Sequence, residues 1–130
     1  MKRAPLPFDY VRPRKRKRDK DNRAYLTWCH KHLFCPISLS REFDLHHLRR
    51  DEQGPIGKSN HDDRRIFPLR HDLHRAEFAG SLHSMGERHF FEKQGFPDYI
   101  SLSAMLFAAF ECGKPEMAQA ALMEAMKRAA

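Results

Sequence analysis

Six of the nine histidines in this 130-residue chain lie between positions 46 and 83, namely His46, His47, His61, His71, His74 and His83. Neutral imidazole is the commonest protein ligand for metal ions and the commonest general base. Histidines gathered in so short a segment therefore indicate metal binding, proton transfer or both. One cation beside one free base is a combination that hydrolyses phosphodiester bonds, so metal-assisted hydrolysis is the predicted chemistry.

The tandem pair His46-His47 falls near the end of a strand expected over residues 42–48. Side chains alternate between the two faces of a strand, which puts His46 on one face together with Asp44 and His47 on the other. If the strand stays regular, only one of the two histidines faces the metal. A bend after Leu45 is therefore expected if both of them act.

Two further histidines of the cluster are expected on one helix. His71 and His74 are three residues apart and share a helix face. His83 lies beyond a break expected at Gly80. Spacing alone leaves open which of these three bind the metal. The histidines outside this set are expected to be non-catalytic: His30, His32, His61 and His89.

The elements that position these histidines are two short strands and several helices. The strands are expected over residues 42–48 and 65–69, the second ended by Pro68, with a Gly-containing loop over residues 50–63 between them. Helices are expected over residues 22–32 (with Asp21 or Asn22 as N-cap), 71–78, 84–94, 98–111 and 115–129. The fold class is therefore α+β.

The last two expected helices are separated by Gly113 and Pro115, which end one helix and begin the next. Each has an apolar stripe, so we expect a C-terminal helical hairpin over residues 97–130 that packs on the core. Methionines within the stripes favour protein contacts as well. A dimer formed through these helices is the alternative.

The net charge of +7 is concentrated at the N-terminus. Residues 1–24 contain ten Lys or Arg and three Asp, whereas residues 25–130 contain fourteen of each sign. We expect residues 1–22 to be a disordered arm that binds DNA phosphates, with a solubilising tail as the alternative. The candidate DNA-binding residues are Arg14, Lys15, Arg16, Lys17, Arg18, Arg49 and Lys58.

Composition excludes several other classes. No apolar run approaches the roughly 18 residues of a membrane span, and no apolar signal segment is apparent near the N-terminus. Cys29, Cys35 and Cys112 are too few and too irregular for a disulfide framework. A cytoplasmic protein with reduced thiols and no membrane partner is expected.

Residues 23–96 resemble the HNH (ββα-metal) nucleases of phages and prophages, particularly those similar to the recombination enhancement nuclease. No single motif is specific, but six occur in the family's order. They are Tyr25-Leu26 of a helix, Cys35 of a turn, His46-His47, the loop Gly54 to Lys58, Ile66-Phe67-Pro68-Leu69 followed by His74, and His83-x-x-Gly86-x-x-x-Phe90.

The resemblance implies a small ββα-metal core with flanking helices and one divalent cation, which is Mg²⁺, Mn²⁺ or Zn²⁺. His47 would be the general base, and His46, His74 and His83 the metal ligands. Three further residues are candidates either to bind the metal or to orient its ligands: His71, Asp63 and Asp44.

Relatives of this kind often hold a structural zinc ion with two Cys-x-x-Cys-like pairs. Here the first pair is Cys35 and Ser38, and the second pair is Arg70 and Leu73. Three of the four cysteine positions therefore lack a cysteine, and a four-ligand zinc site is not expected. A trio of Cys29, His32 and Cys35 is a less favoured alternative. Packing should replace the zinc, through Trp28, Leu33, Phe34, Phe43 and Phe67.

The sequence thus leaves three hypotheses. The first is a metal-dependent HNH endonuclease that cleaves DNA. The second is a non-catalytic DNA-binding accessory protein for recombination or packaging that retains the HNH fold. The third is a small interaction protein whose histidines bind a structural metal. His47 favours the first hypothesis, because a structural site needs ligands but no free base.

Overall fold

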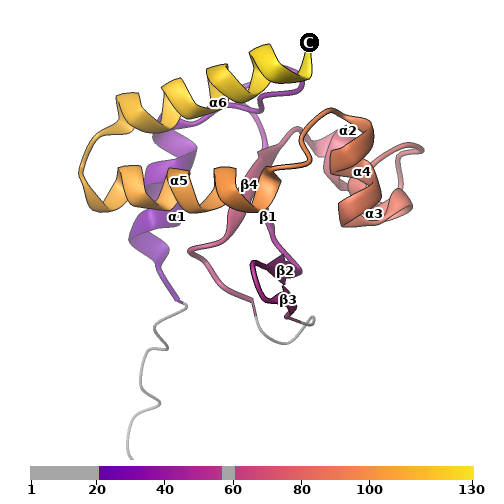
Figure 1. Ribbon diagram of the computed structural model, residues 1–130, viewed down its shortest axis with the longest axis horizontal. Helices are drawn as coiled ribbons and strands as arrows, with labels where there is room; N and C mark the ends of the chain where they lie inside the picture. Colours follow the sequence, from indigo (N-terminus) through magenta and orange to yellow (C-terminus); the bar gives the residue numbers. More distant parts are fainter. Residues whose placement is uncertain (1–20, 57–60) are drawn as a thin grey trace, which may run out of the picture.

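The computed structural model describes residues 21–56 and 61–130 (Figure 1). The predictions for residues 1–20, with the basic run Arg14 to Arg18, and for Lys58 lie outside the described residues. The helices are α1 (Arg23–His32), α2 (His71–His74), α3 (Leu82–Met85), α4 (Glu87–Lys93), α5 (Tyr99–Glu111) and α6 (Pro115–Ala129). The strands are β1 (Asp44–His47), β2 (Arg50–Asp51), β3 (Gly54–Pro55) and β4 (Ile66–Leu69).

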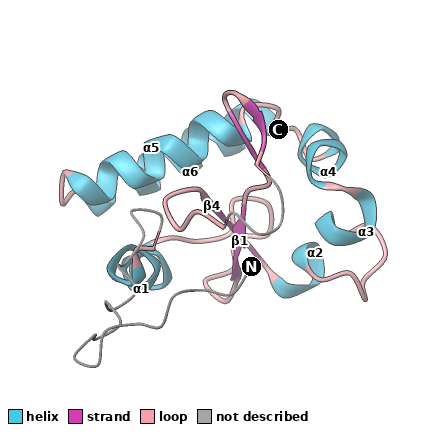
Figure 2. Ribbon diagram, turned by 90° about the horizontal axis from the view of Figure 1, so that it is seen from below, coloured by secondary structure: helices cyan, strands magenta, loops and turns pink. Residues whose placement is uncertain are grey.

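The described strands form two small antiparallel sheets, β1–β4 and β2–β3, and the mixture with helices is compatible with the expected α+β class. In Figure 2 the β1–β4 sheet lies between α1 on one side and α2, α3 and α4 on the other. The β2–β3 hairpin occupies part of the segment 50–63, which we expected to be a loop throughout. That short hairpin contains Gly54 with a φ of +127°, a conformation that favours glycine.

Strand β1 pairs with β4 without interruption, from Asp44 opposite Leu69 to His47 opposite Ile66. The bend expected after Leu45 is therefore absent. Pro68 was expected to end the second strand, but it lies inside β4 opposite Leu45. A two-stranded sheet leaves one side of each strand without a partner, so the missing N–H of a proline is tolerated there.

Helix α1 is capped by Asn22, the second of the two expected N-caps. The Asn22 side chain accepts a hydrogen bond of 3.0 Å from the backbone N–H of Tyr25. Its own backbone N–H donates to the carboxylate of Asp63 at 2.8 Å, which joins the start of the helix to the segment before β4. Asn22 is therefore part of the folded core rather than of the arm.

The helices after β4 are shorter than expected. The helix predicted over residues 71–78 ends at His74, because Arg75 is extended. The helix predicted over residues 84–94 is two helices, α3 and α4, divided at Gly86 with a φ of +95°. Helix α3 starts at Leu82 because the Ser81 side chain accepts the N–H of Ser84 and caps it.

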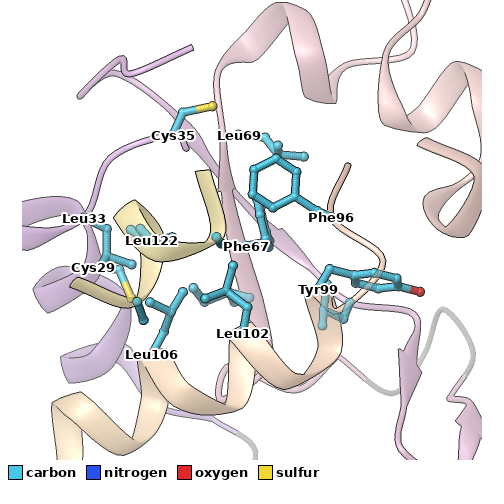
Figure 3. Packing of buried hydrophobic residues seen from close by; sticks show 14 of the residues in the cluster. Cys29, Leu33, Cys35, Phe67, Leu69, Phe96, Tyr99, Leu102, Leu106 and Leu122 are labelled. Atoms are coloured by element: carbon cyan, nitrogen blue, oxygen red, sulfur yellow. The ribbon is translucent and has the colours of Figure 1, made fainter. Parts of the chain in front are cut away.

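Helices α5 and α6 form the expected hairpin and lie side by side in Figure 1. Helix α5 also contacts β4 and α1. Figure 3 shows the shared core, in which side chains of α5 and α6 such as Leu102, Leu106 and Leu122 approach Phe67 of β4. Within the described chain no helix combines the length and apolarity needed to cross a membrane. The dimer contact stays a prediction.

Aromatic rings connect this core to the histidine strand. The Phe91 ring of α4 lies 4.6 Å from that of Phe67 and 6.4 Å from that of His46, measured between centroids. The packing that was expected to replace a structural zinc is also present: Leu33, Phe43 and Phe67 are buried, and Trp28 and Phe34 pack against them.

Candidate metal centre

Three histidines from β1, α2 and α3 converge on one point. Nδ1 of His46 lies 3.2 Å from Nε2 of His74, which lies 3.0 Å from Nε2 of His83. One ring nitrogen from each of the three histidines lies within 4.8 Å of the other two. Nitrogens bound at about 2.1 Å to one cation are about 3.0–3.4 Å apart in octahedral or tetrahedral geometry. The triad is therefore close enough to bind one metal ion.

In two of these rings, the nitrogen that does not take part in the triad contacts a carboxylate. Nε2 of His46 is 2.6 Å from Oε1 of Glu87, and Nδ1 of His74 is 3.0 Å from Oδ2 of Asp44. A carboxylate accepts the ring N–H, so the opposite nitrogen keeps its lone pair and becomes a stronger ligand. The lone pairs of His46 and His74 then face each other at 3.2 Å, a repulsion that a cation between them removes. The donor set thus fits a metal.

The buried histidine of the triad is electrically neutral. His46 is only 2% exposed, and this burial lowers its pKa to about 4, outweighing the hydrogen bond from its ring to Glu87, which raises it. Partial burial and the neighbouring His74 also lower the pKa of His83. Both imidazoles are therefore neutral near pH 7, which is the form that binds metal.

Asp44 lies outside the triad and accepts a hydrogen bond from the ring of His74. Its carboxylate also accepts from Nδ1 of His71 at 2.6 Å and from Nε of Arg75 at 3.1 Å. Burial raises the pKa of Asp44, but the hydrogen bonds from Arg75, His74 and His71 outweigh it and lower the pKa to about 2. The two helix histidines thus differ in position. His74 belongs to the triad, whereas His71 is hydrogen-bonded to Asp44 outside the triad.

His47 has a different partner from the triad. Its Nε2 lies 2.8 Å from Oδ1 of Asp63, whose other oxygen accepts the backbone N–H of Asn22. The ring of His61 stacks on the ring of His47, with centroids 5.0 Å apart and 22° between the planes. Since Asp63 accepts the proton on Nε2, Nδ1 of His47 carries the lone pair.

The triad and His47 nevertheless open onto the same pocket. It has a volume of about 150 Å³ and is lined by Leu45, His46, His47, Leu48, Arg49, His61, His74 and His83. That is room for several water molecules or for a cation with a small anion. Both tandem histidines reach this pocket although β1 is regular through His47.

Sequence reasoning did not identify two residues at this site, Glu87 and His61. A glutamate in the first turn of a helix is usually explained by the helix dipole, so Glu87 carried no signal of a metal site. His61 is among the histidines expected to be non-catalytic, yet it lines the pocket. Nothing in the residues around it indicates that its ring stacks on His47.

Cysteines do not contribute to a comparable group. Within residues 21–56 and 61–130, the histidine triad is the one set of three or more potential ligands close enough to hold a metal. Cys29 and Cys35 are buried in the apolar core, and burial raises the pKa of the Cys29 thiol to about 12. A protonated thiol is a poor metal ligand.

Exposed arginine lies at the mouth of the pocket. Arg49 directly follows Leu48, and its side chain is exposed while its backbone N–H donates to Glu87 at 2.9 Å. Of the seven residues proposed to bind DNA, Arg49 is the one within the described part of the chain. It borders the pocket that the triad and His47 share.

Comparison of this chain with protein-family models, with curated proteins and with solved structures found no match. The resemblance to HNH nucleases therefore rests on the sequence motifs alone.

Proposed function

We propose that this chain is a metal-dependent endonuclease of the HNH type that hydrolyses phosphodiester bonds in DNA. His46, His74 and His83 hold one divalent cation, and His47 is the general base. One observation carries the proposal: three converging imidazole nitrogens share a pocket with a fourth histidine that is oriented separately by Asp63. A purely structural metal site needs no such base.

The metal class follows from the ligand atoms. Three imidazole nitrogens suit Zn²⁺, Ni²⁺, Cu²⁺ or Fe²⁺, whereas Mg²⁺ and Mn²⁺ prefer oxygen ligands, and Mg²⁺ retains most of its waters. Among Mg²⁺, Mn²⁺ and Zn²⁺, the three imidazole ligands favour Zn²⁺. When bound, the cation polarises the scissile phosphate and stabilises negative charge on the leaving oxygen.

His47 supplies the proton chemistry. Its Nδ1 takes a proton from a water molecule as the water oxygen attacks phosphorus and the bond to the leaving oxygen breaks. Asp63, at 2.8 Å from Nε2, stabilises the imidazolium that results and fixes the orientation of the ring. The negative charge of Asp63 therefore compensates the positive charge of protonated His47, and none of the metal ligands is needed for this.

DNA is the proposed substrate because of the positive charge that the chain carries. Arg49 lies exposed at the pocket, and the basic run Arg12 to Arg18 adds charges that neutralise phosphates. Such contacts position a nucleic-acid backbone without reading its sequence.

Cleavage of supercoiled plasmid tests this function. The wild-type chain is stripped of metal with a chelator and assayed with added Zn²⁺, Mn²⁺, Co²⁺ or Mg²⁺, alongside His74→Ala. We expect nicked and linear DNA with at least one of the transition metals, and none with the chelator or with His74→Ala. A wild type that binds metal and DNA but cleaves nothing would instead support the non-catalytic accessory protein.

A further inference from the structure

Glu87 is a buried carboxylate at the start of α4, with a side chain that is 6% exposed. Its Oε1 accepts from Nε2 of His46 at 2.6 Å and from the backbone N–H of Arg49 at 2.9 Å. The hydroxyl of Tyr99 donates to Oε2 at 3.5 Å. In Figure 3 this hydroxyl points away from the apolar cluster that surrounds the rest of the ring. Glu87 thus connects β1, α4 and α5.

A buried carboxylate is costly unless hydrogen bonds compensate for its lost hydration. Both close partners of Glu87 belong to the segment that carries the two tandem histidines, because Arg49 comes two residues after His47. The shorter of the two bonds is made with the His46 ring of the triad, on the nitrogen opposite the one that approaches His74. The carboxylate is therefore placed to act on that ring.

The local backbone explains how a helix residue reaches the strand. Gly86, with a φ of +95°, turns the chain from α3 into α4, so Glu87 lies only four residues after the ligand His83. One short segment consequently provides the ligand His83 from α3 and, from α4, the carboxylate of Glu87 that contacts the ligand His46.

We propose that Glu87 is a positioning residue for the metal centre. It holds His46 as the tautomer protonated on Nε2, with Nδ1 turned toward the cation, and through Arg49 it fixes the end of the strand that carries both tandem histidines. This inference rests on the metal-binding part of the proposed function and is independent of whether the chain cleaves DNA.

A merely structural carboxylate would change the stability of the metal-free protein without changing the metal affinity of the folded chain. Glu87→Gln separates the two roles, because the amide keeps the size of the side chain and one acceptor but removes the charge. Glu92→Gln is the matched control: it makes the same change on the same helix, at an exposed residue whose partner is Arg88 at 3.0 Å.

The full-length variants are titrated with Co²⁺, and binding is followed by its visible absorption. Thermal unfolding of each metal-free protein is measured in parallel. Loss of an outer partner typically weakens metal affinity by about 10–100-fold, so we expect that loss in Glu87→Gln and wild-type affinity in Glu92→Gln. Equal Co²⁺ affinity in folded Glu87→Gln and wild type would overturn the inference.

A second measurement needs no variant. Long-range ¹H–¹⁵N correlation spectra of the metal-free wild type report which ring nitrogen of His46 is protonated. Protonation on Nε2 is expected, and protonation on Nδ1 would overturn the inference even if Glu87→Gln failed to fold. A wild type that binds no Co²⁺ would overturn both proposals. Co²⁺ binding weakened by Glu87→Gln in a chain that cleaves no DNA would overturn the nuclease and leave the role of Glu87 supported.

Discussion

His47 and Asp63 form a pair in which Nε2 of the histidine lies 2.8 Å from a carboxylate oxygen. Asp63 precedes β4, and its other oxygen accepts the N–H of Asn22 at the start of α1. Residues from three parts of the chain therefore fix one imidazole in the pocket that the histidine triad also lines. This ring is separate from the three that converge, so the proposed base and the proposed ligands can be altered independently.

Asp63→Ala should lower kcat by about 10–100-fold, because the His47 ring loses its orientation and the imidazolium loses its partner. Metal affinity should stay at the wild-type value, since no ligand contacts Asp63 among the described interactions. Steady-state cleavage together with a Co²⁺ titration checks both parts. Asp72→Ala, which removes an exposed carboxylate paired with Arg70, is the control. Weaker metal binding in Asp63→Ala would contradict the separation of base and ligands.

His71 and His74 make a matched pair on one short helix. His74→Ala should abolish stoichiometric Co²⁺ or Zn²⁺ binding, because it removes the nitrogen that lies between the other two ligands. His71→Ala should retain binding with at most about a tenfold loss, since His71 contacts the cation site only through Asp44. Calorimetric titration of both variants measures this. The reverse order of affinities would assign the ligand to His71.

Deleting residues 1–20 should weaken DNA binding and reduce its dependence on salt, by about 0.9 in logarithmic slope for each phosphate that the arm no longer neutralises. The deletion leaves Asn22 in place, so the cap of α1 and its bond to Asp63 are preserved. Thermal unfolding should consequently be unchanged. Fluorescence anisotropy over a salt series provides the measurement. An unchanged slope would mean that the arm only increases solubility and that DNA is held by arginines around the pocket, such as Arg49.

Asp62 should make the free energy of unfolding depend on pH in the acid range. Burial raises the pKa of Asp62, but hydrogen bonds from Arg64 outweigh it, and the net shift is downward. A carboxyl with a lowered pKa in the folded state stabilises the protein above its unfolded pKa of about 3.9, and this stabilisation is lost as the pH falls below that value. Urea unfolding between pH 6 and pH 3 should show a steeper loss for wild type than for Asp62→Asn. Parallel curves would contradict the assignment.

Three features could be predicted from the sequence. They are the position of the tandem histidines at the end of a strand, the two paired strands and the C-terminal hairpin. His46-His47 follows an alternating apolar pattern, and Gly113 with Pro115 marks the turn between two long helices. The convergence of His46, His74 and His83 was implied by the family motifs, and it is present in the structure. Spacing alone would have left His71 and His74 equivalent, because both lie on one turn of helix.

The parts that were missed depend on contacts between distant segments. Glu87 reaches His46 across 41 residues, and nothing in its local sequence distinguishes it from an exposed first-turn glutamate. Helices α2 and α3 span four residues each, which is too short for a hydrophobic period to show their ends. Pro68 was expected to break its strand, a rule that fails in a sheet with only two strands.

The most direct test of the central claim compares plasmid cleavage by wild type, His47→Ala and His89→Ala, with the metal content of each sample measured. His89 is an exposed histidine of α4, so His89→Ala controls for loss of an imidazole. We predict that His47→Ala binds one metal ion as tightly as wild type but cleaves at least about 10²-fold more slowly, while His89→Ala matches wild type. Cleavage by metal-loaded His47→Ala at the wild-type rate would contradict the assignment of His47 as the general base.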